Sequence, residues 1–335
     1  RTLTLDAGTG SSINLKGRIG NSEALSGLTI TQSNATTFHN RVDVSDSNAG
    51  TITITDTTDN RTVQFKGGLL TTDNFVTTTQ GYNIRFRNDA TFTNAVTFQN
   101  TGTLELGDSV SDDITFNGGV TENTTGTVSI DGTIFSSDDA ISLGNIVVDK
   151  DLSMTSAGGA ISIGTITGAS GSQDITITSS GGSANTVAVG AIGGSDNINT
   201  VAITGSTSVT LNGNITTDNS SGNSVTVTGT TINTGAITID TDNSSNDDAI
   251  NLVGSVAGGN NNLVLNSGTA EITLSGTALN LGSGSLTTTG DINLANNVSI
   301  TATGGITIND KIDADSASSN DRTLTLNSGT GSAIT

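Results

Sequence analysis

Asn199-Thr-Val-Ala-Ile-Thr-Gly205 leads to Thr217-Asp-Asn-Ser-Ser221, and the same order returns as Asn223-Ser-Val-Thr-Val-Thr-Gly229 followed by Thr241-Asp-Asn-Ser-Ser245. When the copy that begins at Asn199 is aligned with the copy that begins at Asn223, half of the aligned positions are identical. Apolar residues alternate with Ala or Thr in each copy, and a period of two is typical of β-strands. We therefore predict that each copy is one coil, whose strands pair in parallel with the equivalent strands of the next coil.

Other repeats extend this pattern over the chain. Leu152-Ser-Met-Thr-Ser-Ala-Gly-Gly159 is similar to Ile175-Thr-Ile-Thr-Ser-Ser-Gly-Gly182, at nearly the same spacing. Residues 1–14 return as residues 322–335 with ten identities in 14 positions, which gives a long period of 321 residues. We therefore expect one continuous solenoid over residues 1–335, in which residues 1–321 form one long period and residues 322–335 begin the next.

The composition is that of stacked short strands. The 335 residues include 43 Gly but no Pro, Cys or Trp, and Thr, Ser, Asn and Asp separate Ile, Val and Leu. Thr favours strands and is soluble on their wet side, whereas Pro would remove a hydrogen-bond donor from the ladder. The prediction is an all-β fold, a parallel β-helix of about 14 coils of about 23 residues, with aliphatic side chains stacked inside it.

The charge excludes one class of partner. The formal net charge is −20, with eight basic and eight acidic residues in 1–90 but two basic and 23 acidic residues in 91–321. Nucleic-acid binding needs clustered Lys and Arg, so we expect no nucleic-acid partner. No run of the sequence approaches the roughly 20 apolar residues of a membrane span, so we also expect no membrane insertion in this segment.

Three segments carry a resemblance to a known group of proteins: Leu3-Thr-Leu-Asp-Ala-Gly-Thr-Gly-Ser11, Leu28-Thr-Ile30 and Ala95-Val-Thr-Phe98. Together with the repeat style of nearly the whole chain, they resemble the beta-strand-repeat regions of giant secreted bacterial adhesins of the filamentous-haemagglutinin type. The resemblance implies a right-handed β-helix, an extracellular or cell-surface location, and an adhesion, matrix or fibre function. It implies no catalytic residues.

We accordingly expect a structural or adhesive segment without enzymatic activity and without a cofactor. Its expected partners are further copies of the repeat and a cell-surface or glycan receptor. The alternatives are a carbohydrate-binding or carbohydrate-cleaving β-helix, a calcium-dependent surface-layer protein, and an ice binder. A glycan-active solenoid needs aromatic platforms or an acid cluster on one face, and Tyr82 is the only Tyr. His39, the only histidine, is expected in a turn or on the surface.

Acidic residues supply the candidate metal ligands. Ca²⁺ takes several oxygen ligands, so a calcium site is predicted if the coils bring together Asp240, Asp242, Asp247 and Asp248. The same reasoning applies to the doublets Asp112-Asp113 and Asp138-Asp139, and solvated acidic turns are the alternative for all of them. A carbohydrate-cleaving β-helix needs clustered acids with a basic residue on one face. The nearest candidates are Asp149-Lys-Asp151 and Asp310-Lys-Ile-Asp313, and a solvated turn is the simpler interpretation of each.

Large side chains are confined to the first part of the chain. All eight Phe residues precede residue 136, which predicts a wider or differently shaped core there and an aliphatic core afterwards. The segment Arg85-Phe-Arg87 predicts a strand with Phe86 inward and both arginines outward. Isolated surface arginines are the default interpretation, and docking on an acidic band of a neighbour is the alternative.

Overall fold

The computed structural model describes residues 1–123, 126–169, 172–182, 185–194, 198–218, 223–243, 246–314 and 321–335. Strands make up 56% of the chain and helix 1%, as a parallel β-solenoid of about 13 turns of about 23 residues. The predicted all-β parallel β-helix is confirmed. The number of turns is close to the predicted 14 and differs from it because coil lengths are uneven, so that one average length does not fit them all. The chain divides into two compact units, Arg1–Ile163 and Gly164–Thr335.

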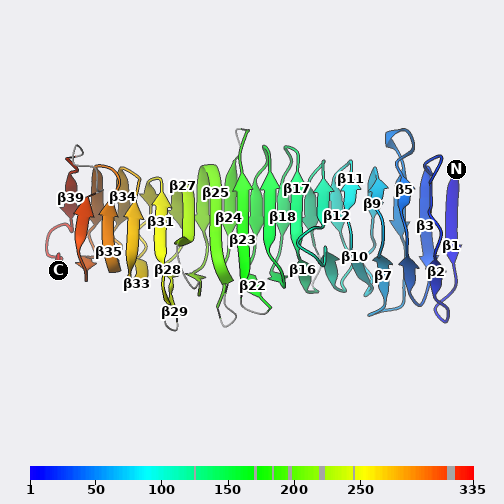
Figure 1. Cartoon of the computed structure of the whole chain (residues 1–335), viewed down its shortest axis with the longest axis horizontal. Coiled ribbons are helices and arrows are strands. Elements are labelled where there is room, and N and C mark those ends of the chain that lie inside the picture. Colours follow the sequence, from blue (N-terminus) through cyan, green and yellow to red (C-terminus); the bar gives the residue numbers. More distant parts are fainter. Residues whose placement is uncertain are drawn as a thin grey trace. The chain divides into compact units, whose positions relative to one another are not determined.

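In the first unit, successive coils place their strands side by side in three parallel columns over the described residues (Figure 1). The first column contains β1 (Thr2–Asp6), β3 (Gly27–Gln32), β6 (Thr51–Ile54), β9 (Asn74–Val76), β12 (Val96–Phe98), β15 (Val120–Glu122), β18 (Ile141–Leu143) and β21 (Ile161–Ile163). The second contains β5 (Val42–Val44), β8 (Leu70–Thr72), β11 (Ala90–Phe92), β14 (Asp113–Phe116), β17 (Gly132–Ser136) and β20 (Leu152–Ser156). The third contains β2 (Ile13–Leu15), β4 (Thr36–Phe38), β7 (Thr62–Phe65), β10 (Asn83–Phe86), β13 (Leu104–Leu106), β16 (Val128–Ile130) and β19 (Ile146–Val148). A short 3-10 helix, η1 (Asp46–Asn48), follows β5.

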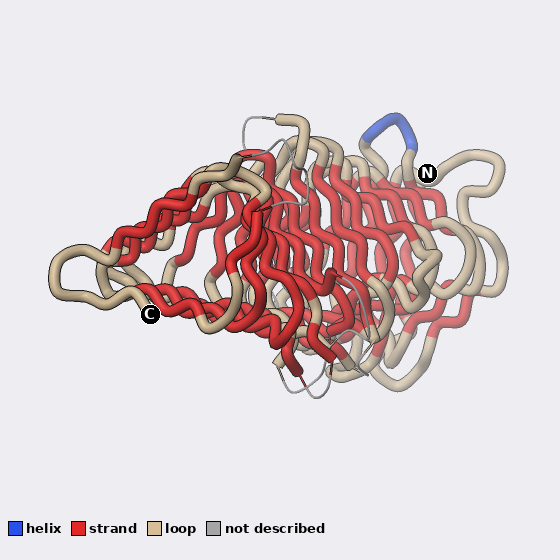
Figure 2. The backbone as a smooth tube through the Cα atoms, turned by 60° about the vertical axis from the view of Figure 1, so that its left-hand side comes forward, coloured by secondary structure: helices blue, strands red, loops and turns tan. Residues whose placement is uncertain are grey.

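The second unit uses the same plan with longer strands, four of which pair in two columns each. Figure 2 shows strands of successive coils lying side by side. The first column contains β23 (Gln173–Ser179), β25 (Ile198–Leu211), β27 (Asn223–Asn233), β31 (Ala249–Val253), β33 (Leu263–Leu274), β35 (Leu286–Leu294) and β38 (Ile312–Ala314). The second joins the bent strands β25 and β27 to β24 (Thr186–Val189), β32 (Val256–Ala257), β34 (Ala278–Gly282), β36 (Val298–Ala302) and β39 (Leu324–Asn327). The third joins β33 and β35 to β26 (Ile215–Thr216), β28 (Ile237–Asp240) and β37 (Ile306–Ile308).

Two smaller elements complete the second unit. The strand β22 (Ile166–Gly168) is linked by single bridges through Ile192 to Ile215. The strands β29 (Asp242–Asn243) and β30 (Asn246–Asp247) form an antiparallel pair of two residues each. This short pair directly precedes β31, where the register of the parallel ladder with β27 shifts between Asn223 and Val225.

The strand register confirms the repeat that the sequence predicts. Val201 is the Cα partner of Val225, Ile203 of Val227, and Ile215 of Ile239. The two members of each pair have the same separation along the chain as Asn199 and Asn223, where the aligned copies begin. The equivalent residues therefore stack on one another in successive coils.

An aliphatic ladder forms the core of the second unit. Five residues that are Cα partners in turn lie along it with almost no exposed surface: Val201, Val225, Ile250, Ile272 and Ile292. Removing apolar surface from water contributes about 25 cal/mol per Å², so each further coil adds a similar increment of stability. The predicted aliphatic core of this part is confirmed.

Aromatic rings fill the core of the first unit. Seven of its eight Phe side chains are buried, and Phe86 lies at the centre of the group. Its ring centroid is 5.3 Å from that of Phe65, and it meets the rings of Phe75 and Phe92 edge to face at 5.4 Å each. Phe135 differs, because Ile134 and Ser136 take the inward positions of β17 and alternation turns Phe135 outward.

Outside, the strands carry a row of hydroxyl side chains. Along the first column of the first unit, the outward-facing Cα partners in successive coils are Thr4, Thr29, Thr53, Val76, Thr97, Thr121, Ser142 and Ser162. Thr2, Gly27, Thr51 and Asn74 form a second outward-facing row beside it in the first coils. Both rows lie on the wet side of strands, where Thr is expected.

Candidate functional site

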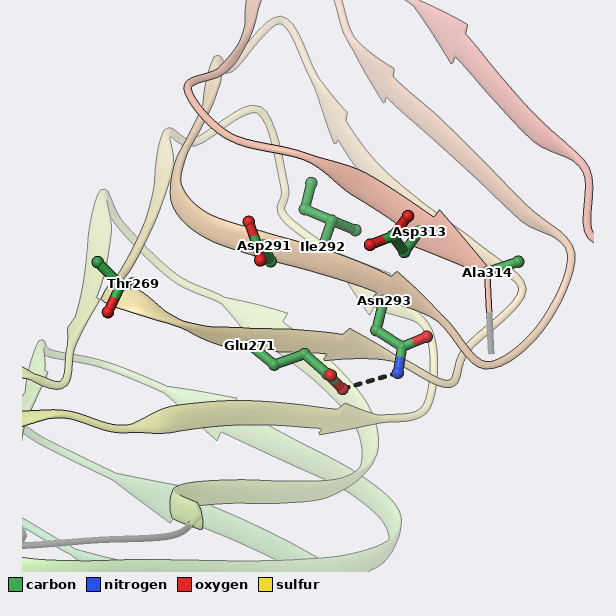
Figure 3. Close-up of a pocket in the computed structure, with 7 residues that line it drawn as sticks. All are labelled: Thr269, Glu271, Asp291, Ile292, Asn293, Asp313 and Ala314. Atoms are coloured by element: carbon green, nitrogen blue, oxygen red, sulfur yellow. Dashed lines mark hydrogen bonds between the residues drawn. The ribbon is translucent and has the colours of Figure 1, made fainter. Parts of the chain in front are cut away.

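A groove lies on the outward face of β33, β35 and β38 in the second unit, with a volume of about 520 Å³. Figure 3 shows the seven residues that line it: Thr269, Glu271, Asp291, Ile292, Asn293, Asp313 and Ala314. Glu271 and Asp291 are Cα partners in adjacent coils, and so are Asn293 and Asp313. The stacking of coils therefore brings three carboxyl groups to one surface.

Short polar contacts organise this groove. Asn293 Nδ2 donates to Glu271 Oε1 at 2.7 Å, the contact drawn in Figure 3, and Thr273 Oγ1 donates to the same oxygen at 2.8 Å. Lys311 Nζ lies 2.6 Å from Asp291 Oδ2. The hydrogen bond from Lys311 lowers the pKa of Asp291. The carboxyl group of Asp291 is therefore already paired with a positive charge of the same unit.

Only part of this cluster is predictable from the sequence. Lys311 and Asp313 were expected in a solvated turn, but Asp313 belongs to β38, and Lys311 reaches back one coil to Asp291. Glu271 was not identified. Glu271 lies about one coil before Asp291, and Asp291 lies about one coil before Asp313. This spacing would identify Glu271 as a member of the cluster once the coil length is known.

The predicted arginine strand is observed, with Phe86 buried and both arginines on the outer face. Arg87 Nε donates to Glu105 Oε1 at 2.9 Å, and Arg85 Nε lies 3.0 Å from Glu105 Oε2. Glu105 is the residue that stacks on Arg85 in the next coil. The two guanidinium groups therefore bind a carboxylate of the same unit, and the suggested docking on a neighbour has no structural support.

Three of the four candidate calcium ligands lie near the β29–β30 hairpin. Asn266 Nδ2 donates to Asp240 Oδ1 at 3.0 Å and to Asp242 Oδ2 at 3.5 Å. Asp242 is the Cα partner of Asp247, whose Oδ2 accepts a hydrogen bond from the backbone N–H of Thr269 at 2.8 Å. Partial burial and the carboxyl group of Asp247 raise the pKa of Asp242, whereas the hydrogen bonds from Thr269 lower the pKa of Asp247.

The fourth candidate, Asp248, occupies a core position. Asp248 is 1% exposed, and among the described residues neither of its carboxylate oxygens has a hydrogen-bond partner. The repeat offset aligns Asp248 with Ser224, although the strand register shifts there and places Asn223 beside Ala249 and Val225 beside Ile250. The Oγ of Ser224 accepts a hydrogen bond from Thr217 Oγ1 at 2.9 Å. In the later coil the hydroxyl of Thr241 donates instead to the backbone oxygen of Asp248. The carboxylate of Asp248 therefore has no hydrogen bond among the described residues.

Replacing Asp248 by the serine of the preceding coil should stabilise the protein near neutral pH. A buried polar group without a partner costs about 1–3 kcal/mol, so Asp248→Ser is expected to raise the free energy of unfolding by about that amount. Burial, and then the charges of Asp218 and Asp247, raise the pKa of Asp248 above that of the unfolded chain. The native state then binds the proton more tightly, so stability falls as pH rises through the native pKa.

Urea unfolding of both chains at about pH 7 and about pH 4 measures this effect, and the advantage of the variant should shrink at the lower pH. Asp247→Ser is the matched control on the adjacent residue, because it removes an acceptor of Thr269 and should destabilise. An equal gain from Asp248→Ser at both pH values would show that the buried charge is not the cause.

The remaining candidates lie apart from these groups. Asp112 is buried, and its Oδ2 accepts hydrogen bonds from the backbone N–H groups of Asp108 and Ser109 at 2.8 and 3.1 Å, which closes a turn. Asp113, Asp138 and Asp139 are exposed. Lys150 pairs with the neighbouring Asp149 in an exposed turn.

The two ring-bearing polar residues offer no site. His39 is half-buried directly after β4. Tyr82 is fully buried, and its hydroxyl donates to the backbone oxygen of Ile54 at 3.1 Å. Tyr82 therefore belongs to the core and cannot serve as a glycan platform.

Among the residues that the structure describes, no three His, Cys, Asp or Glu side chains are grouped so as to hold a metal ion. The calcium site therefore stays a prediction. In the described part of the chain no helix is long and apolar enough to span a membrane. Comparison of the chain with protein-family models, with curated proteins and with solved structures finds no match.

Proposed function

We propose that this chain is a structural or adhesive segment of a long extracellular repeat protein that forms a stiff surface fibre. The parallel strand ladder carries the proposal, because within each compact unit it joins successive coils of the described residues through backbone hydrogen bonds. Val201, Val225 and Ile250 stack in one unbroken row inside, and hydroxyl side chains face water outside. Such an assembly resists bending and lengthens by one strand spacing with every coil.

The repeat of residues 1–14 at residues 322–335 supports the extension of this segment into an array. The bacterial, secreted and adhesin parts of the proposal rest on the resemblance to filamentous-haemagglutinin-type repeats. A cell-surface or glycan receptor is the expected partner for an adhesive role, and further copies of the repeat are the expected partners for a fibre.

Electron microscopy of a protein that carries several periods tests the fibre. At about 4.8 Å per coil, roughly 13 coils predict an axial repeat near 60 Å along a thin filament. Compact particles without that axial repeat would contradict the proposed fibre. Binding of the same protein to cells, compared before and after enzymatic removal of surface glycans, separates an adhesive role from a purely structural one.

A carbohydrate-active solenoid is the second candidate, and the groove on β33, β35 and β38 favours it. Glu271, Asp291 and Asp313 form the kind of acid cluster that this alternative needs. Titration calorimetry against neutral and amino-sugar oligosaccharides should show binding that the double variant Asp291→Asn, Asp313→Asn abolishes. Asp138→Asn, a change at an exposed acid of the other unit, is the control. Equal heats for both variants would eliminate the groove as a glycan site.

Calcium dependence distinguishes the surface-layer alternative from these two. Addition of EDTA should leave the fold and assembly of a plain fibre unchanged, and should dismantle a calcium-dependent layer.

A further inference from the structure

One corner of the first unit carries a row of basic side chains, at the turns that follow the strands of the third column. The backbone N–H groups of His39, Lys66 and Arg87 each donate, at 2.9 Å, to the last residue of the preceding strand in that column. The first residues of these turns therefore stack one per coil, and Lys16 begins the row after β2. The chain has only 11 Lys and Arg residues and one His, and four of them occupy successive positions here.

The same row becomes acidic in the later coils, where Gly107, Asp131 and Asp149 follow β13, β16 and β19. A second row, on the other side of the same turns, changes sign in the same direction along the coils: Arg18, Arg41, Leu69, Asp89 and Asp113. The two rows together form the charged corner. It is positive along the coils of β2, β4 and β7 and negative along those of β13, β16 and β19.

This arrangement is unfavourable within a single copy. Neighbouring coils lie about 4.8 Å apart, and like charges at directly paired positions, such as Lys66 and Arg87, repel each other. Among the described residues Lys16, His39 and Lys66 form no ion pair, whereas Lys150 and Lys311 each pair with a carboxylate. A local conflict that the fold does not resolve is typical of a functional surface. The partner of the basic half therefore has to supply negative charge.

Two exposed apolar side chains lie on the same corner. Leu69, in the coil of β7, is 39% exposed, and Val110, in the turn after β13, is 57% exposed. They lie one coil before and one coil after Arg87. The charge of Arg87 is offset within its own copy, because its Nε lies 2.9 Å from Glu105 Oε1 and 3.6 Å from Asp108 Oδ2. The charges and the apolar groups are thus both arranged about the coil of Arg87.

We propose that two copies of this chain pack side by side and antiparallel along the charged corner, about a two-fold axis at the coil of Arg87. The axis places the coil of β7 of one copy opposite the coil of β13 of the other. Lys66 then lies opposite Asp108, and Leu69 lies opposite Val110. Both pairs occur twice because the contact is isologous. The rise of about 4.8 Å per coil is the same in both copies, so successive coils stay in register.

A second copy fits this surface better than an acidic polysaccharide does. The polysaccharide would cover the basic half and leave the acidic half and Val110 exposed, whereas a second copy covers both halves. The outer coils extend the match, since the coil of β2 lies opposite that of β19 and brings Lys16 near Asp149. The apolar pairs lie close to the axis, and charged pairs lie on either side of them, as in the apolar centre and polar rim of other protein interfaces.

Sedimentation equilibrium of the full chain tests the contact. At about 0.15 M salt the screening length is about 8 Å, so the net charge of −20 acts weakly between copies and directly opposed pairs act strongly. The unchanged chain should form a dimer, and Lys66→Glu or Asp108→Lys should each weaken it by about tenfold or more. An equimolar mixture of the two variants should form a mixed dimer of nearly the original affinity. In that mixture the two changed positions face each other, and so do the two unchanged ones.

Arg61→Glu is the matched control for Lys66→Glu. Arg61 precedes β7 and Lys66 follows it, and both residues are exposed, so the same change of charge is made at another corner of one coil. The control should remain a dimer. A monomeric unchanged chain would overturn the proposal, and so would equal losses from Arg61→Glu and Lys66→Glu. A monomer that binds an acidic polysaccharide through Lys66 would overturn it in favour of a glycan partner.

Disulfide trapping tests the orientation, since the chain has no cysteine of its own. Full chains with Leu69→Cys are mixed with full chains with Val110→Cys and oxidised. The mixed dimer should exceed the dimer of Leu69→Cys chains alone by several-fold, because the antiparallel contact brings Leu69 close to Val110. Parallel packing would bring Leu69 beside Leu69 of the other copy. A predominant dimer of Leu69→Cys chains would therefore overturn the antiparallel contact.

The inference goes beyond the proposed function, because the contact needs only the first unit of each copy. In a fibre it would join neighbouring filaments side by side. If sedimentation found a monomer, a protein with several periods would still appear as single filaments in electron micrographs. Conversely, a specific dimer together with compact particles would contradict the fibre and leave the lateral contact standing.

Discussion

Phe86→Ala is expected to destabilise the first unit by about 3–5 kcal/mol, the usual cost of deleting a fully buried ring. Phe86 contacts the rings of Phe65, Phe75 and Phe92, so its removal leaves a cavity with aromatic groups on several sides. The neighbouring strands are fixed in register by the coils on either side, and they cannot move inward to close it. The loss should therefore lie toward the upper end of this range.

Tyr82 provides the measurement for this variant. It is the only Tyr in a chain without Trp, and it is buried in the same unit, so its emission reports unfolding of this core in urea. Phe135→Thr is the matched control, because Phe135 faces outward with Thr115 and Thr155 as its partners in the adjacent coils. That change should cost less than about 1 kcal/mol. Similar losses for the two variants would contradict the observed packing.

Gly229→Ala should have the second large effect, in the other unit. Gly229 has φ of 120°, which an L-residue with a side chain rarely adopts, and a Cβ there would overlap the backbone oxygen of Gly205 in the preceding coil. Gly254 meets Gly229 in the same way, so this bend of the solenoid is a column of stacked glycines. Backbone strain of this kind costs about 1–3 kcal/mol, and the overlap adds to it because the coils would have to separate.

Hydrogen exchange read by mass spectrometry checks this prediction. Peptides from β25, β27 and β31 should lose protection in Gly229→Ala, since these strands meet at the bend. Gly235→Ala is the control, because a Cβ at Gly235 meets no atom within 4 Å. Unchanged protection in Gly229→Ala would show that the coils tolerate a side chain there.

The spacing between sequence repeats predicts which strands pair. It does not predict which hydrogen bonds the side chains form. The offset between the two aligned copies correctly paired Val201 with Val225 because register in a parallel stack follows the apolar pattern. The same offset identifies Ser224 and Asp248 as equivalent, yet it gives no sign that Thr241 bonds to the backbone and leaves the Asp248 carboxylate without a partner. The alternation of apolar and polar residues predicts which side chains face inward. It does not predict which side chains form hydrogen bonds between neighbouring coils.

The groove formed by Glu271, Asp291 and Asp313 depends on the lengths of the coils that separate these residues. Successive members of this set are one coil apart, and they meet only because each intervening coil closes to the same angular position. An insertion of one residue would turn a side chain from the outer face to the core. Sequence spacing alone does not reveal where such irregularities fall, since the chain also contains coils of other lengths.

The sequence by itself determined the all-β class, the parallel coil, and the aliphatic and aromatic parts of the core. Alternation and repeat length specify these features because they are properties of successive residues along one strand. Only the tertiary structure decided that Phe135 faces outward and that Glu105 binds both Arg85 and Arg87. It also decided that Asp248 is buried without a hydrogen-bond partner for its carboxylate among the described residues. Those outcomes depend on which residue of one coil stacks on which residue of the next, and that alignment is fixed by the lengths of all the loops between them.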